Sequence, residues 1–358
     1  MKNTKINNFL LLNTLFFGVI LAFSFSTFSC SKQNKANGNE KKYSIVASNF
    51  VCYDFARAVL GDNLGKTAEL KLLIKPGAEV HSFDPTPADI IAINEADLFI
   101  YIGGESDEWV DSVLFDAIGK NKNAPACLKM IDFVKTLEEP AGLENAEHEH
   151  HLHHAQHDIE GNEHEEHEED AEHEEHEHEH DTESDEHIWT SPKNALIMLE
   201  KISNSILENC PTLQQFSILE NYQNYAKQIE QIDQRFNEII ENATQKYIVM
   251  ADRFPFAYFA DCYNLNYMAA FAGCSTAVEA SSATIAKLIE TVKQKNLKGV
   301  FYIELTNHKI ADTVSESAKV PAFMLYSLQN ISKSDFDNGE TYISLMNKNA
   351  ETLKTVLQ

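Results

Sequence analysis

Short apolar runs alternate with segments of helical spacing in the first third of the chain. Runs of this kind, apolar on successive residues, are typical of strands buried on both faces of a parallel sheet. The predicted strands cover 43–49, 68–74 and 97–103, and the predicted helices cover 53–60 and 86–94, the second started by a TPAD sequence. The alternation predicts an α/β lobe with a mostly parallel sheet flanked by helices, over residues 43–143.

The same rhythm returns in the last third of the chain. Strands are predicted over 247–251, 266–272, 299–304 and 321–326, and helices over 256–263, 282–294, 309–318 and 341–356. These elements predict a second α/β lobe over residues 244–358, although no sequence repeat relates the two lobes.

A single long amphipathic helix is predicted between the lobes, over residues 212–243. Apolar and aromatic residues recur there at steps of three and four, and no Gly or Pro interrupts them. Such a helix would be about 48 Å long. The alternative, a coiled coil, requires a strict heptad that the steps do not keep. A rigid rod of this length limits how far the two lobes can hinge.

The N-terminus predicts export. Two lysines precede an apolar run over residues 9–28, and Ser29 precedes Cys30 as in a lipoprotein processing site. We expect residues 1–29 to be a signal peptide, Cys30 to be lipidated, and residues 30–42 to be a flexible tether. An ordinary cleaved signal or an uncleaved anchor are the alternatives. Either way the protein is expected in the cell envelope, outside the cytoplasmic membrane, lipid-anchored or periplasmic.

Six cysteines occur and none forms a CxxC pair, which argues against a zinc ribbon or thioredoxin chemistry. Cys262 and Cys274 are near enough in sequence for a disulfide, but two buried free thiols are the favoured interpretation.

The formal charge of −26 is local, since residues 144–187 hold 20 acids and neither Lys nor Arg. Without that segment the charge is −6, which is ordinary for a soluble domain. No basic stripe or basic aromatic face is present in the sequence, so nucleic-acid binding is not expected.

Twelve of the fifteen histidines lie between His148 and His180, interleaved with acids. Imidazole and carboxylate suit divalent transition metals, but this segment has too little apolar content to fold. Residues 144–186 are therefore predicted to form a disordered loop that binds several ions weakly. The alternative is a solvated acidic loop whose histidines are incidental.

A fixed metal site needs ligands on ordered elements, which leaves His81, His187 and His308. His81 follows a predicted strand, at the sheet edge where α/β proteins bind ligands. His187 opens HIWTSP, where the chain becomes ordered again and completes the first lobe over residues 187–211. His308 is expected at an exposed helix start. A surface histidine with a local hydrogen bond is the alternative for the first two.

Several motifs occur in a specific order: PGAEVHSFDPTPADI, DEHIWTSP, the long helix, and MADRFPFAYFADCYNL. From Tyr43 to the C-terminus the chain resembles the metal-binding solute-binding proteins of bacterial zinc and manganese ABC importers. The resemblance implies that His81 and His187 are metal ligands. It also implies that the His-rich segment is the loop that zinc-type members carry just before the second of these histidines.

The third ligand of that family, His or Glu, ends the first strand of the second lobe. The ungapped match falls on Arg253, which stays protonated and cannot ligate. We assign the neighbouring Asp252 instead, with a helix cap or a partner of Arg253 as the alternative role.

The family's fourth position, an Asp in manganese-type members, falls near Leu328 or Gln329, where no acid occurs. This absence favours Zn²⁺ over Mn²⁺, which prefers more oxygen ligands. Glu304, at the end of a predicted strand, is a further candidate ligand. It could instead contact His187 or pair with Arg253.

The sequence thus predicts a monomeric extracytoplasmic receptor, not an enzyme, that captures zinc and passes it to an ABC permease. A manganese receptor of the same family is the nearest alternative. An exported zinc hydrolase is a further alternative, but outside the His-rich segment the sequence contains neither an HExxH motif nor a nucleophile elbow. A surface metal buffer would leave the two patterned lobes unexplained.

Overall fold

The structure, a computed structural model, describes residues 42–113, 124–143, 184–277 and 279–358. The predicted signal peptide, Cys30 and nearly all of the predicted tether and His-rich loop lie outside these residues. Within the described ranges, no helix combines the length and apolar content needed to cross a bilayer.

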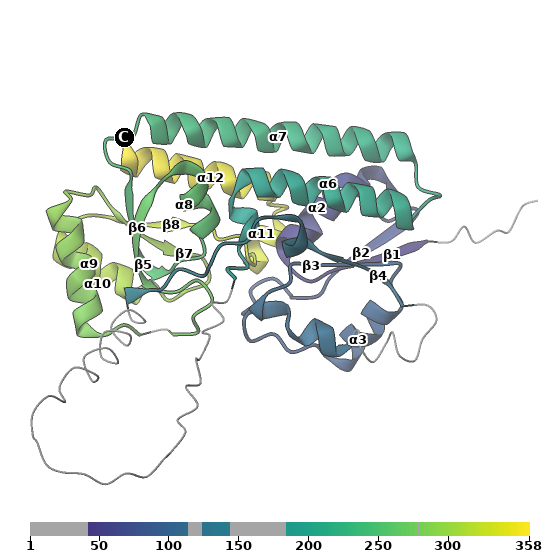
Figure 1. The fold of residues 1–358 in the computed structure, drawn as a ribbon, viewed down its shortest axis with the longest axis horizontal. Helices are drawn as coiled ribbons and strands as arrows, with labels where there is room; N and C mark the ends of the chain where they lie inside the picture. The colour runs from purple at the N-terminus through teal and green to yellow at the C-terminus, as the bar shows by residue number, and fades with distance from the viewer. Residues whose placement is uncertain (1–41, 114–123, 144–183, 278) are drawn as a thin grey trace, which may run out of the picture. The chain divides into compact units, whose positions relative to one another are not determined.

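The first lobe is built on a four-stranded parallel sheet with the order β2-β1-β3-β4 (Figure 1). Each predicted strand and helix is present. The structure adds β4, a strand of only four mostly half-exposed residues that sequence patterning missed. The elements are β1 (Tyr43–Ala47), α2 (Phe50–Leu60), β2 (Ala68–Leu72), α3 (Pro87–Asn94), β3 (Leu98–Tyr101) and β4 (Ala126–Lys129).

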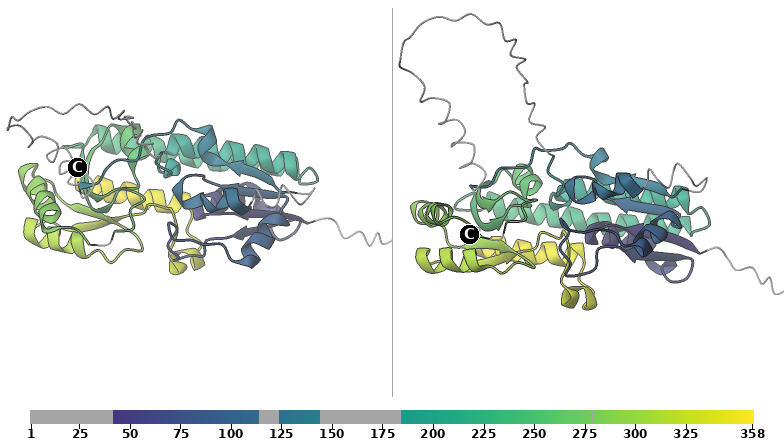
Figure 2. Two further views of the ribbon diagram at one scale, coloured as in Figure 1. Left: turned by 60° about the horizontal axis from the view of Figure 1, so that its bottom comes forward. Right: turned by 90° about the horizontal axis from the view of Figure 1, so that it is seen from below.

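The second lobe repeats this order with another parallel sheet, β6-β5-β7-β8, which Figure 2 shows from two further sides. All four predicted strands and all four predicted helices are present, so the two-lobed α/β fold is confirmed. The elements are β5 (Tyr247–Arg253), α8 (Ala257–Tyr263), β6 (Asn266–Phe271), α9 (Ser282–Gln294), β7 (Val300–Ile303), α10 (Lys309–Ala318), β8 (Ala322–Leu325), α11 (Lys333–Asp337) and α12 (Tyr342–Leu357).

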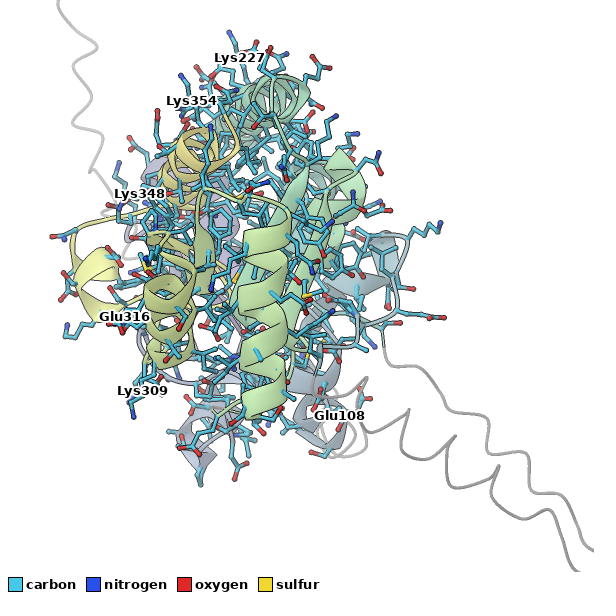
Figure 3. All side chains as sticks on the ribbon, turned by 90° about the vertical axis from the view of Figure 1, so that its left-hand side faces the viewer. Glu108, Lys227, Lys309, Glu316, Lys348 and Lys354 are labelled. Carbon is cyan, nitrogen blue, oxygen red and sulfur yellow. The ribbon has the colours of Figure 1, made fainter. Side chains whose placement is uncertain are left out.

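The predicted long helix is α7 (Gln215–Glu241), uninterrupted over 27 residues, or about 40 Å. It packs on α2 of the first lobe, on α12 at the end of the second, and on α6 (Pro192–Asn209) beside it. Its charged residues lie on the outer surface, as Lys227 does in Figure 3. The backbone between the lobes is therefore a layer of helices rather than one rod.

Asp54 ties three of these helices together inside the core. Its fully buried carboxylate accepts hydrogen bonds from the Tyr225 hydroxyl of α7, from the Tyr342 amide of α12 at 2.9 Å, and from Arg57. A buried carboxylate with this many partners links the two lobes through a common core.

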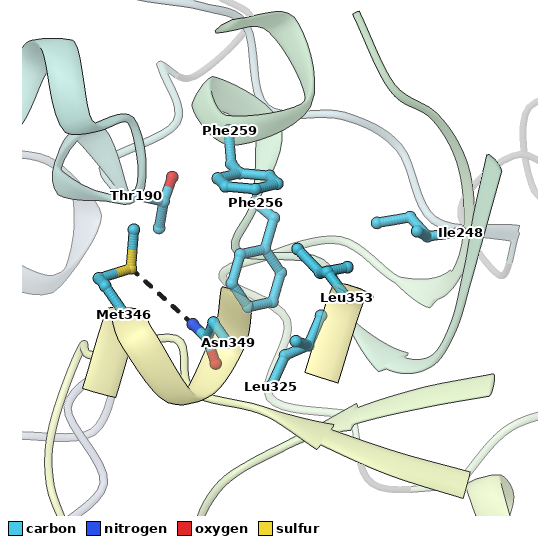
Figure 4. A pocket seen from close by; sticks show the side chains of 8 residues that line it. All are labelled: Thr190, Ile248, Phe256, Phe259, Leu325, Met346, Asn349 and Leu353. Atoms are coloured by element: carbon cyan, nitrogen blue, oxygen red, sulfur yellow. Dashed lines mark hydrogen bonds between the residues drawn. The ribbon is translucent and has the colours of Figure 1, made fainter. Parts of the chain in front are cut away.

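The shared core is densely filled. A cavity of about 10 Å³ lies among α8, β5, β8 and α12. Eight residues line it, and Figure 4 labels all of them. Its volume is roughly the space of one water molecule. The cavity is too small for a ligand, so the chemistry lies elsewhere, at the edges of the sheets.

Candidate metal centre

His81 lies in the loop between β2 and α3, at the carboxyl edge of the first sheet. The far end of this loop is fixed by the Thr86–Asp89 capping box that starts α3, as the TPAD sequence predicts. The ring of His81 is held at both nitrogens: Nδ1 lies 2.9 Å from Ser106 Oγ, and Nε2 lies 3.0 Å from Gln329 Nε2.

The hydrogen bonds around Ser106 fix the tautomer of His81. Ser106 Oγ donates its one proton to Glu186 Oε1, so it must accept from Nδ1–H of His81. The Gln329 amide donates to Glu186 Oε1 at 3.0 Å and to Nε2 of His81. His81 is therefore neutral in this arrangement, with the lone pair of Nε2 directed toward Gln329.

His187 lies immediately before the short 3-10 turn Ile188–Thr190 that leads into α6. Its Nδ1 is 3.1 Å from Asp185 Oδ1, and its backbone amide donates to the same oxygen at 2.7 Å. Its Nε2 is buried and has no hydrogen-bond partner within the described part of the chain. A carboxylate on one imidazole nitrogen and a free lone pair on the other is the arrangement of metal-binding histidines.

Burial and charge act in opposite directions on the two rings. Burial lowers the pKa of His81, and the neighbouring His187 and Arg253 reinforce this effect against the Glu186 carboxylate. Burial also lowers the pKa of His187, but Asp185 and Glu186 outweigh it and the net pKa is raised. His187 therefore holds a proton more tightly than His81 does, and an incoming cation has to compete with that proton mainly at His187.

The structure brings the two imidazoles to one point, with their ring centroids 6.0 Å apart. Glu186 and Cys274 complete this group, and the four potential ligand atoms all lie within 4.8 Å of one another. The two imidazoles are 2 % and 0 % exposed. The cluster is thus a dry, four-donor group at the seam between the lobes.

Two members of this group were not predicted as site residues. Glu186 fell in the segment expected to be disordered, and its position directly before His187 was the available signal. Cys274 comes from the loop after β6 in the second lobe, and no ligand spacing marked it. The interpretation of Cys262 and Cys274 as free thiols is confirmed. Burial, with Glu186 next, raises the pKa of Cys274 far above its usual value.

Asp252, assigned from the sequence as the third ligand, lies on β5 with both oxygens engaged. Oδ1 accepts from the Arg253 amide at 2.9 Å, and Oδ2 accepts from Thr306 Oγ1 at 2.8 Å and from the Ile303 amide. Burial raises the pKa of this carboxyl despite the hydrogen bonds. The structure does not bring Asp252 into the group around the two histidines.

Glu304, the other candidate carboxylate, also has both oxygens engaged in hydrogen bonds. Its oxygens accept from the amide and hydroxyl of Ser327 at 2.7 and 2.9 Å, and from the Leu328 amide at 2.9 Å. Burial raises the pKa of Glu304 to about 7. Glu304 therefore holds the loop after β8, and it too lies outside the four-residue group.

The remaining predicted residues lie away from the cluster's centre. Arg253 reaches Glu79 at 3.4 Å, across the groove between the lobes. His308 is half-exposed and pairs with Asp312 at 3.0 Å, as expected for a surface histidine at a helix start.

Comparison with known proteins identifies the family of the chain. The family described as "Zinc-uptake complex component A periplasmic" matches residues 45–356. The zinc-binding lipoprotein AdcA of Streptococcus pneumoniae R6 is 30% identical over 326 residues, which are 91% of this chain and 57% of that protein. The high-affinity zinc uptake system protein ZnuA of Bacillus subtilis 168 is 28% identical over 91% of both chains.

Solved structures show the same fold. The Zn(II)-bound ZnuA-like domain of S. pneumoniae AdcA superposes with a TM-score of 0.65 and 26% identity, over 88% of this chain and 99% of that domain. The chain spans little more than half the length of full AdcA, and it corresponds to that domain.

Proposed function

The chain belongs to the family of zinc-uptake complex component A, and we propose that it is the substrate-binding protein of a zinc ABC importer. In this role it captures Zn²⁺ outside the cytoplasmic membrane and delivers the ion to a permease. The observation that carries the proposal is the buried Nε2 of His187, which has no hydrogen-bond partner among the described residues and belongs to a ring whose centroid is 6.0 Å from that of a second imidazole. A buried polar atom of this kind normally has a partner, and a cation would supply it.

We propose His81 and His187 as two of the ligands, each through Nε2. The partners of their Nδ1 atoms, Ser106 and Asp185, hold the rings in the tautomer that leaves Nε2 free to coordinate. Asp252 and Glu304 stay candidates from the sequence. Either would have to release two or three hydrogen bonds before it could reach the ion.

Capture requires movement, because the imidazoles are closed off from solvent in the described conformation. The amide of Gln329 contacts the Nε2 of His81, so this side chain has to turn away when an ion arrives. We propose that the loop carrying Gln329 moves with the second lobe on ion entry and returns around the bound ion. The helical layer of α6, α7 and α12 keeps this movement small.

The cellular setting is proposed from the sequence and the relatives' names. An export signal followed by lipidation at Cys30 would hold a monomer at the outer face of the cytoplasmic membrane, within reach of the permease. AdcA is named a lipoprotein, which supports this arrangement. The absence of a basic stripe from the sequence gives no basis for nucleic-acid binding.

We further propose that the protein is not an enzyme and that the His-rich segment 144–183 is accessory to the fixed site. Both carboxylates near the second lobe's edge hold backbone amides, which leaves them poorly placed as general bases. The zinc-loaded protein should show no hydrolysis of ester, phosphate or peptide substrates above a metal-free control.

Calorimetric titration of metal-free protein, purified without a histidine tag, tests the main proposal. We expect one tight zinc site per chain, a weaker response to Mn²⁺, and an unchanged tight site after deletion of residues 144–183. Loss of the tight site on that deletion would show that the ion is not held where we place it.

A further inference from the structure

The two imidazoles leave the ion short of ligands. Structural and transport sites for Zn²⁺ usually hold four donors in a tetrahedron. Arg253 of the second lobe cannot supply a further donor, because its guanidinium stays protonated and is committed to Glu79 and to the carbonyl of Ser275. Another donor from the second lobe is therefore needed if this lobe is to contact the ion.

We propose that Cys274 is that donor, and that the ion is held by His81, His187, the thiolate of Cys274 and the carboxylate of Glu186. This inference rests on the proposed function and specifies the ligands of that site. The four donor atoms already lie within 4.8 Å of one another. Zn–N distances of about 2.1 Å and Zn–S distances of about 2.3 Å place tetrahedral donors roughly 3.5 Å apart, so a contraction of about 1 Å completes the site.

The loop that carries Cys274 is fixed against the imidazole. The Cys274 amide donates to Glu139 Oε1 at 2.6 Å, which anchors the loop to a segment of the first lobe. Gly273 runs so close that a Cβ there would lie 3.2 Å from Cε1 of His187 and 3.0 Å from the carbonyl oxygen of Phe254. A glycine at this position lets the backbone bring the next side chain into the cluster.

The unpartnered Nε2 of His187 is independent support. It is the one ring nitrogen of the pair that has no hydrogen bond within the described ranges, and its ring belongs to the same four-residue group as Cys274. The coordinating step is balanced: the ion gains a sulfur ligand, the S–H bond breaks, and the proton passes to buffer.

Charge also favours this ligand set. Two neutral imidazoles contribute no charge, whereas one thiolate and one carboxylate together offset the two positive charges of Zn²⁺. A neutral complex suits a site whose histidines are 2 % and 0 % exposed, because an uncompensated charge in such surroundings is costly. A site of two imidazoles and water would stay doubly positive.

Cobalt substitution tests the assignment. Co²⁺ bound to thiolate gives a sulfur-to-metal charge-transfer band in the ultraviolet that nitrogen and oxygen ligands do not give. We expect this band in the native protein at one Co²⁺ per chain, its loss in Cys274→Ser, and its retention in Cys127→Ser, a control that removes an exposed thiol. Zinc affinity should fall about a hundredfold in Cys274→Ser alone.

The outcomes separate this inference from the proposed function. One tightly bound Co²⁺ without the band, or a band retained in Cys274→Ser, overturns the role of Cys274 and leaves zinc capture standing. Absence of any tight Zn²⁺ or Co²⁺ site in the native protein overturns both. If Cys274→Ser does not fold, the native band and the protection of one thiol from alkylation by stoichiometric zinc still decide the question.

Discussion

The two lobes have the same strand order but use the carboxyl edges of their sheets differently. At the edge of the first lobe, and in the segment entering α6, polar side chains orient both imidazoles and leave the Nε2 of His187 without a hydrogen bond within the described residues. At the edge of the second lobe, the carboxylate oxygens of Asp252 and Glu304 accept hydrogen bonds from backbone amides of neighbouring segments. Equal topology therefore does not mean equal shares in a binding site.

The difference teaches how to separate ligands from scaffold. A side chain at a sheet edge is a good ligand candidate when its partners orient it and several other potential donors lie close to it. It is scaffold when its hydrogen bonds hold neighbouring loops and it lies outside such a group, as Asp252 and Glu304 do. By this criterion the first lobe supplies the two imidazoles and Glu186, whereas the second lobe supplies Cys274 and uses Asp252 and Glu304 as a frame.

The largest expected effect comes from His187→Ala. Removing an oriented imidazole should weaken zinc binding by more than about a hundredfold, since loss of a mere supporting partner already costs roughly 10- to 100-fold. Competition against a chromogenic chelator measures it. His308→Ala, which removes a half-exposed histidine paired with Asp312, is the matched control and should bind as the native protein does.

Glu304→Gln tests whether the second lobe's carboxylate is scaffold. Its folded-state pKa of about 7 lies above its ordinary value of 4.5, so the folded protein binds this proton more tightly than the unfolded chain does. The contribution of Glu304 to stability is therefore full below about pH 4.5 and is lost as pH rises through about 7, by roughly 3 kcal/mol at most.

Urea denaturation of metal-free protein between pH 5 and 8 measures this effect. The stability of Glu304→Gln relative to the native protein should rise with pH across that window. Glu340→Gln is the control. Lys348 lowers the pKa of Glu340, so this carboxylate is ionised in both the folded and the unfolded protein between pH 5 and 8. A flat difference for Glu304→Gln would contradict the assigned pKa.

Asp185→Asn, in the first lobe, should have an intermediate effect on zinc affinity. The asparagine keeps the shape but loses the charge that orients His187 and favours its cationic partner, so zinc affinity should fall roughly tenfold. Asp312→Asn changes the equivalent exposed carboxylate beside His308 and should leave affinity unchanged. An equal loss in both variants would show a general charge effect instead.

Sequence patterning could predict the lobes because their strands and helices are locally consistent. The run of α9, for example, has the period, the Ser281 cap and the length of a helix all in one segment. It could also predict His81 and His187, since each sits in a motif at the point where a loop meets an ordered element. Patterning missed β4, which is only four residues long and has a single buried residue.

The rest of the site depends on contacts that sequence spacing does not encode. Cys274 lies in the group of His187 beside Gly273, where the backbone runs so close that a Cβ would come within 3.2 Å of the His187 ring. Glu186 is ordered by hydrogen bonds to Ser106, which lies 80 residues earlier in the chain. The positions of Asp252 and Glu304 at strand ends were foreseen, but the amides that occupy their oxygens come from tertiary packing.

Asp252→Asn should have the smallest effect and tests most directly whether this carboxylate of the second lobe is scaffold. If Asp252 is scaffold, the asparagine can still accept from Thr306 through its side-chain oxygen, and zinc affinity should change less than about threefold while stability falls by about 1 kcal/mol. Thr306→Val, which removes the donor instead, should lower stability by a similar amount and also leave affinity intact. A hundredfold loss of affinity in Asp252→Asn alone would mean that the carboxylate leaves its amides to bind the ion. The second lobe would then coordinate the ion through the residue assigned from the sequence, in place of or beside Cys274.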